Sequence, residues 1–120
     1  MNASVDLRAR TADFSLAVIQ FFAGLPRETA ARILGRQLLR SATSVGAQYR
    51  EAKRAKSTAD FISKSEGALQ ELDETAYWLE LIERSGIEST VSVRDLRTET
   101  NQLIAIFVTL VKTAKQNKQK

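Results

Sequence analysis

Chain-breaking residues are scarce in this sequence, and their scarcity limits the possible folds more than any other feature. Among 120 residues there are one proline and five glycines. Such sparse turn chemistry argues against many short strands and favours a few long helices. Apolar side chains recur every three to four positions, as they do along one face of an amphipathic helix. The sequence therefore predicts an all-α fold.

Four segments carry this helical periodicity, and they cover about residues 5–23, 27–55, 58–85 and 91–114. The run Gly-Leu-Pro at 24–26 separates the first two, because glycine suits a helix C-cap and proline suits a helix start. Ser57 or Thr58 is the expected N-cap of the third helix, with Asp60 as a capping-box partner, and Gly86 is its expected C-cap.

Short links between the first three helices favour antiparallel neighbours. We therefore predict one domain over residues 1–120, folded as an up-down-up-down four-helix bundle. An extended helical pair completed by another chain is the alternative. Residues 115–120 form a basic tail with no apolar side chain to bury, so we expect this tail to fray.

The chain contains no cysteine and no histidine. Their absence excludes disulfides, zinc fingers, cysteine or histidine nucleophiles and the usual transition-metal sites. Residues 1–7 lack the features of a signal peptide, and the most apolar window, residues 103–111, is far shorter than the ~20 residues of a membrane span. We expect a soluble, cytoplasmic protein with no cofactor, no metal and no membrane contact.

The stretch RSATSVGAQYREAKRAKS, residues 40–57, could be read as a phosphate-binding loop followed by a basic helix. The loop is excluded, because the stretch has one glycine, no GK[ST] motif and no preceding strand. Helical phase also continues through it, along the apolar series Leu34, Leu38, Ala42, Val45, Tyr49 and Ala52. The stretch is therefore expected to be one continuous helix up to about residue 55.

Small residues cluster in the middle of this predicted helix, around Ser44, Gly46 and Ala47. A glycine inside a helix costs about 0.8–1 kcal/mol relative to alanine, so close approach of another backbone is expected there. Two explanations remain open: tight packing inside one bundle, or a contact between subunits.

Five arginines of the same helix share one narrow sector opposite its apolar stripe, and they are Arg32, Arg36, Arg40, Arg50 and Arg54. Such a face could contact a nucleic-acid backbone, since arginine forms charge-assisted hydrogen bonds with phosphate and releases counterions. A solvated face, or one paired with acidic side chains, is the alternative.

Charge differs sharply between the two central helices. Residues 27–56 contain eight basic and two acidic side chains, whereas residues 58–85 contain seven acidic and two basic ones. Two outer faces of opposite charge suit a head-to-tail contact between identical subunits, and such contacts can close into a ring. Aromatic residues off the apolar stripe suit the same role. The residues expected at a subunit interface are Ser44, Gly46, Ala47, Glu51, Glu71, Tyr77, Trp78 and Leu81.

Catalysis has little support from the residue pattern. The carboxylates occupy solvent-facing helical positions, and Glu83 is the one marginal exception within an apolar stripe. A di-metal site in a bundle core would need carboxylates inside these stripes, with Glu-x-x-His partners. We therefore expect a protein that is not an enzyme.

Recognisable motifs run in order from residue 25 to residue 86: Leu25-Pro26 with Glu28, Gln37-Leu38-Leu39-Arg40-Ser41-Ala42, Ser44-Val45-Gly46-Ala47, Glu51-Ala52, Lys56-Ser57, Asp60-Phe61-Ile62, Ala68, Glu71 and Tyr77-Trp78-Leu79. In order and spacing they resemble the four-helix bundle protein family, also known as the 23S ribosomal RNA intervening-sequence proteins. The resemblance covers about half the chain. Members commonly have asparagine in place of Gln48, and many have glycine in place of Ala52.

The resemblance implies an antiparallel four-helix bundle that assembles as a ring, typically a bacterial homopentamer. Similar proteins include the accessory variability protein of diversity-generating retroelements, which resembles a pentameric bundle with a basic surface for reverse transcriptase and nucleic acid. Many other similar proteins have no established activity.

Residue pattern and resemblance together predict a non-catalytic homo-oligomer. We expect it to bind structured RNA or DNA through Arg32, Arg36, Arg40, Arg50 and Arg54, with a reverse transcriptase as a further candidate partner. The alternative is a protein-binding scaffold in which the basic and acidic faces serve subunit assembly only.

Overall fold

A computed structural model describes residues 6–88 and 90–118. It contains four α-helices, α1 (Leu7–Ala23), α2 (Thr29–Lys53), α3 (Thr58–Arg84) and α4 (Val91–Lys118), and no strand in the described ranges. The all-α prediction is confirmed. The predicted start of the first helix at residue 5 lies outside the described residues. None of the described helices is long and apolar enough to cross a membrane.

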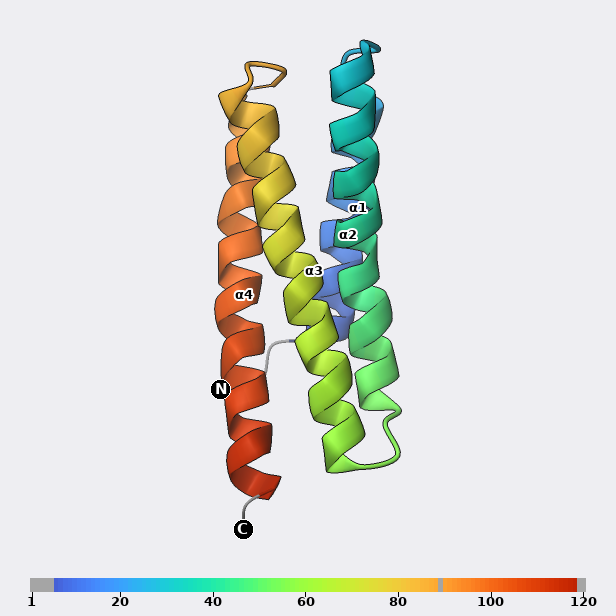
Figure 1. Ribbon diagram of the computed structural model, residues 1–120, viewed down its shortest axis with the longest axis vertical. Helices are drawn as coiled ribbons and strands as arrows, with labels where there is room; N and C mark the ends of the chain where they lie inside the picture. Colours follow the sequence, from blue (N-terminus) through green and yellow to red (C-terminus); the bar gives the residue numbers. More distant parts are fainter. Residues whose placement is uncertain (1–5, 89, 119–120) are drawn as a thin grey trace.

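The helices lie side by side along the long axis of the molecule, and the chain reverses direction at each connection (Figure 1). Helix α2 packs between α1 and α3, α3 packs on α4, and α4 also touches α1. The resulting bundle measures 52 × 28 × 21 Å. Helix α2 packs on α1 and α3 but not on α4, which lies diagonally across the bundle. Among the described helices, none covers the outward face of α2.

Apolar side chains from all four helices fill the interior. The most deeply buried include Val18, Leu38, Leu72, Leu79, Leu103 and Phe107. Tyr49 meets Phe107 edge to face, with ring centroids 5.8 Å apart. The apolar stripe predicted for the second helix is confirmed except for Leu34, which is only partly buried, and Leu38, Ala42, Val45, Tyr49 and Ala52 form its buried part.

Hydroxyl side chains are buried in every helix, and most bond to the carbonyl four residues earlier. Thr11 donates to Leu7 O at 2.6 Å, and Thr100 donates to Leu96 O at 2.7 Å. Such bonds let a hydroxyl enter the core without leaving a polar group unpaired.

The caps explain where α2 and α3 begin. Ser57 accepts a hydrogen bond from the Asp60 backbone N–H at 3.0 Å, which confirms it as the N-cap of α3. Helix α2 begins at Thr29, two residues after the expected start at about residue 27, because the backbone of Glu28 is still extended (φ −72°, ψ 159°). Before that point, buried Leu25 packs near Gly35 instead of continuing a helix.

Two helix ends also differ from the prediction. Helix α4 continues to Lys118, so the expected fraying from residue 115 is wrong for residues 115–118. Lys115 forms an ion pair with Glu66 of α3 at 2.9 Å, and lysine and glutamine are good helix formers. At the C-terminal end of α3, the C-cap is Ser85, one residue before the expected Gly86. Gly86 follows it with a left-handed backbone (φ 80°), a conformation that glycine adopts without strain.

Residues 40–53 lie inside α2, so the helical interpretation is confirmed for them, whereas residues 54–57 form the connection to α3. Gly46 is buried, and a Cβ atom placed on it would lie 3.1 Å from Thr11 Oγ1 of α1. Of the two explanations for the small residues, the structure therefore supports packing inside the bundle at this position. Gly46 is not accessible to a neighbouring subunit.

Candidate nucleic-acid interface

The outward face of α2 carries the five arginines, but they do not share one environment. Arg36, Arg50 and Arg54 are exposed, and no acidic side chain of the described residues forms an ion pair with them. Their helical spacing directs them away from the buried stripe of α2, on the side that no other helix covers. These three arginines form the exposed arginine face.

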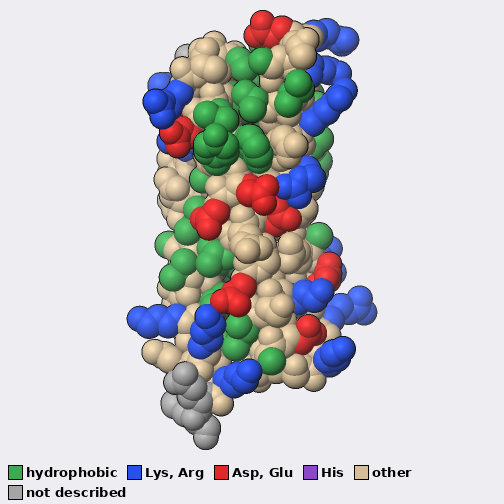
Figure 2. Space-filling view, viewed as in Figure 1, with side chains coloured by type: hydrophobic (Ala, Val, Ile, Leu, Met, Phe, Trp, Pro, Cys, Tyr) green, Lys and Arg blue, Asp and Glu red, His purple; other side chains and the backbone are tan. Residues whose placement is uncertain are grey.

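Arg40 differs from these three, because it bridges α2 to α3 within the same chain. Its guanidinium lies 2.7 Å from Glu74 and 3.4 Å from Glu71. The Arg40 side chain is 50% exposed and that of Glu71 is 15% exposed. Figure 2 shows acidic and basic side chains together across the middle of this side of the molecule. The acidic and basic helices therefore meet inside one bundle at this position.

Arg32 is partly buried at the α1 side of the face. Its guanidinium carbon lies 5.9 Å from the centroid of the Phe22 ring of α1, a cation–π distance. The Arg32 guanidinium therefore lies beside α1, and Arg32 is less exposed than Arg36.

At the end of the bundle where α1 begins and α2 ends, five of the described residues line a depression of about 390 Å³. They are Arg8, Tyr49, Arg50, Lys53 and Arg54. Burial raises the pKa of the Tyr49 hydroxyl, and the negative charge of Asp6 raises it further. We call this site the basic depression.

Two of these basic residues were not among the predicted site residues. Lys53 is a neighbour of Arg50 and Arg54 in the sequence, but its helical position turns it toward α1 and away from the predicted sector. Arg8 reaches the depression only because α1 packs on α2, and nothing in its local sequence signals that.

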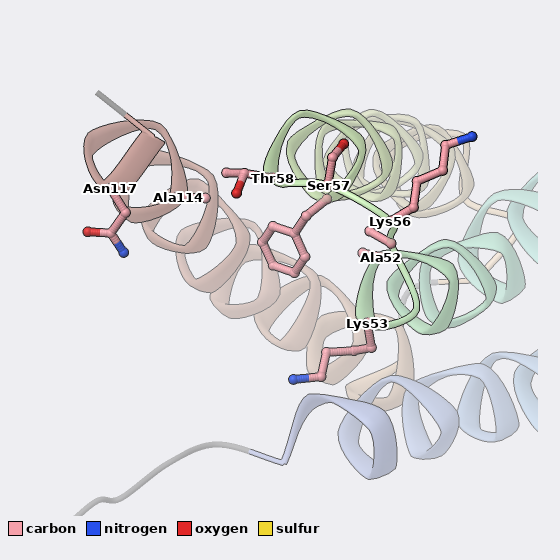
Figure 3. Close-up of a pocket in the computed structure, with 9 residues that line it drawn as sticks. Ala52, Lys53, Lys56, Ser57, Thr58, Ala114 and Asn117 are labelled. Atoms are coloured by element: carbon pink, nitrogen blue, oxygen red, sulfur yellow. The ribbon is translucent and has the colours of Figure 1, made fainter. Parts of the chain in front are cut away.

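Lys53 also borders a second depression, where the α2–α3 connection meets the end of α4. Figure 3 shows its ammonium group extending beside this opening, whereas Lys56 points away from it. Ser57, Thr58 and Asn117 also line this opening.

The other predicted interface residues lie on or beside the α2–α3 side of the bundle. Ala47 is exposed, and Ser44 bonds to the carbonyl of Arg40 at 2.8 Å. Glu51 forms an exposed ion pair with Lys64 of α3 at 3.0 Å. Glu51 and Glu71 therefore both have basic partners within their own chain.

Tyr77, Trp78 and Leu81 form an apolar patch on α3, and Tyr77 is 53% exposed. The rings of Tyr77 and Trp78 lie 5.1 Å apart. The Trp78 Nε1 atom is buried and has no hydrogen-bond partner in the described chain, a state that costs about 1–3 kcal/mol. Apolar side chains gather over the upper half of this side of the molecule in Figure 2.

The acidic residues are not arranged as a metal or catalytic centre in the part of the chain that the structure describes. There, no group of three or more aspartates and glutamates is placed to hold a metal ion, and none of these side chains is fully buried. Glu83, the carboxylate predicted closest to the core, pairs with Arg97 of α4.

Comparisons with known proteins agree with the predicted family. The model of the 23S rRNA-intervening sequence protein family matches residues 4–109. A crystal structure of a protein of unknown function from the S23 ribosomal protein family of Bacteroides thetaiotaomicron is similar, with a TM-score of 0.82 and 31% sequence identity. The match covers 88% of this chain and 97% of that one. The comparison with curated proteins gives no match. The chain belongs to the 23S rRNA-intervening sequence protein family.

Proposed function

We propose that this protein is a non-catalytic accessory protein that binds structured RNA or DNA through the exposed arginine face of α2. One observation carries the proposal: Arg36, Arg50 and Arg54 are exposed and have no acidic partner among the described residues. Five of the carboxylates on α3, by contrast, already pair with basic side chains of the same chain.

A face of this kind recognises phosphates more than bases. Arginine forms short, charge-assisted hydrogen bonds with phosphate oxygens, and each contact displaces condensed counterions. Phosphate contacts position a protein on nucleic acid without reading its sequence. Binding should therefore weaken steeply with salt and show little sequence preference.

Charge reversal tests the proposal. We expect the triple variant Arg36→Glu, Arg50→Glu, Arg54→Glu to bind a structured RNA at least about 100-fold more weakly, because three favourable contacts become repulsive. Fluorescence anisotropy gives the affinity, and circular dichroism checks that the variant is folded.

A matched variant controls for net charge. Reversal of Arg84, Arg94 and Lys112, which are exposed on α3 and α4, changes the total charge equally but leaves α2 intact. An equal loss of affinity in both variants would contradict the proposed face, since it would mean that only overall charge matters.

We also propose that up-down-up-down bundles of this chain assemble as a ring-like homo-oligomer, with the homopentamer implied by the resemblance as the expected form. The exposed ring of Tyr77 supports this proposal. A neighbouring subunit would cover the Tyr77 ring and remove its apolar surface from water. Arg40, Glu51 and Glu71 have partners within the chain, so assembly by charge alone has less support.

The protein partner and the compartment also remain predictions. A reverse transcriptase is the candidate protein partner that the resemblance supplies, and a cytoplasmic location is expected from the sequence. Co-purification with a reverse transcriptase, tested with and without nuclease treatment, would separate a direct protein contact from one bridged by RNA.

A further inference from the structure

The basic depression differs from the rest of the arginine face because its cations come from two helices. Arg8 belongs to α1, whereas Arg50, Lys53 and Arg54 lie at the end of α2. Among the described residues, every charged side chain that lines the depression is basic. Four cations held beside one opening repel one another, and a concentrated negative charge would relieve that repulsion.

Tyr49 adds a neutral donor to this cluster. Its ring is buried, with 8% of the residue exposed, and packs edge to face on Phe107. The residue lines the depression, and no described residue forms a hydrogen bond with its hydroxyl. The core therefore fixes the ring, which leaves the hydroxyl available to an oxygen atom of a ligand.

Asp6 is the acidic residue that acts on Tyr49, but it does not line the depression. Its carboxylate caps α1 by accepting a hydrogen bond from the Ala9 backbone N–H at 3.1 Å. The carboxylate is therefore engaged in the helix cap, and the lining keeps its excess of positive charge.

The number of donors around the depression indicates the class of ligand. A phosphodiester within a nucleic-acid backbone carries one negative charge, whereas a terminal phosphate monoester carries about −1.5 to −2 at pH 7 and offers three acceptor oxygens. The terminal phosphate monoester matches a lining of four cations and one hydroxyl better than the phosphodiester does. We propose that the basic depression binds a terminal phosphate group.

The source of this phosphate rests on the proposed function, which makes the 5′ end of a bound RNA the expected ligand. Inorganic pyrophosphate offers the same chemistry without a nucleic acid. The test therefore uses both sources, so that the terminal-phosphate site and the proposed RNA binding by the arginine face can be contradicted independently.

Two RNAs of identical sequence, one with a 5′ phosphate and one with a 5′ hydroxyl, provide the main comparison. We expect the wild-type protein to bind the phosphorylated RNA about tenfold more tightly, the effect of roughly one charge-assisted hydrogen bond. Tyr49→Phe, which keeps the buried ring, and Lys53→Gln should each reduce this preference. Arg36→Gln, outside the depression, should weaken both RNAs equally and preserve the ratio.

Calorimetry with inorganic pyrophosphate supplies the second arm. Equal affinity of the wild-type protein for the two RNAs would overturn the terminal-phosphate site and leave the proposed function intact. Pyrophosphate binding that Tyr49→Phe weakens, without binding of either RNA, would support the site with a small phosphate as ligand and overturn the proposed function. Absence of binding to both RNAs and to pyrophosphate would overturn both.

Discussion

Gly46 illustrates what a single small residue decides in this bundle. The periodicity around it predicts correctly that it lies within a helix, since the apolar residues on both sides keep one phase. It does not predict what approaches the glycine, because both an internal helix and a neighbouring subunit favour a missing side chain. The proximity of Thr11 Oγ1 and Cβ, 3.1 and 3.3 Å from an added Cβ, comes from the packing of α1 on α2.

Leucine substitutions at adjacent positions test this packing. We expect Gly46→Leu to lower the free energy of unfolding by about 1–3 kcal/mol, because the added side chain would overlap α1. Ala47→Leu, at the exposed neighbouring position, should change it by less than about 0.5 kcal/mol. Urea denaturation measures both variants. Equal stabilities would contradict the assignment of Gly46 to the interior.

At the scale of the element, α2 shows which part of a binding face a sequence can predict. Helical spacing places Arg32, Arg36, Arg40, Arg50 and Arg54 in one sector, but it does not say which carboxylates lie alongside. That depends on the lateral order of the helices, which puts Glu71 and Glu74 of α3 beside Arg40 and the Phe22 ring of α1 beside Arg32.

Single neutral substitutions on α2 separate these environments. We expect Arg50→Gln to weaken RNA binding about threefold to tenfold, since one charge-assisted contact is lost. Arg40→Gln should change the affinity by less than about twofold, because Glu71 and Glu74 already neutralise this guanidinium. Anisotropy titrations at one salt concentration compare the two. A larger loss of RNA affinity for Arg40→Gln than for Arg50→Gln would contradict the division of the arginines into free and ion-paired ones.

For the whole molecule, the number and extent of the helices follow from the sequence more readily than their surfaces do. The four periodic segments correspond to α1–α4 within a few residues at each described end. Arg8 and Lys53 join the candidate site only through the packing of α1 on α2. Periodicity identifies which residues face outward, and only the assembled bundle brings residues of different helices together.

The apolar patch makes a prediction about assembly. If Tyr77, Trp78 and Leu81 contact a neighbouring subunit, the double variant Tyr77→Gln, Leu81→Gln should shift the protein toward the mass of a single chain in light scattering. Val108→Gln, at an exposed apolar position on α4, should leave the assembly unchanged. A wild-type protein that is already monomeric would contradict the proposed oligomer.

The salt dependence of RNA binding tests the central claim most directly. The logarithm of the binding constant should fall linearly with the logarithm of salt concentration, by about 0.7 for each phosphate neutralised on a single strand and about 0.9 on a duplex. Neutral substitution of Arg36, Arg50 and Arg54 with glutamine should therefore make the slope less negative by about 2 to 3. Equal slopes for the wild-type protein and this variant would show that the exposed arginine face does not contact the phosphates.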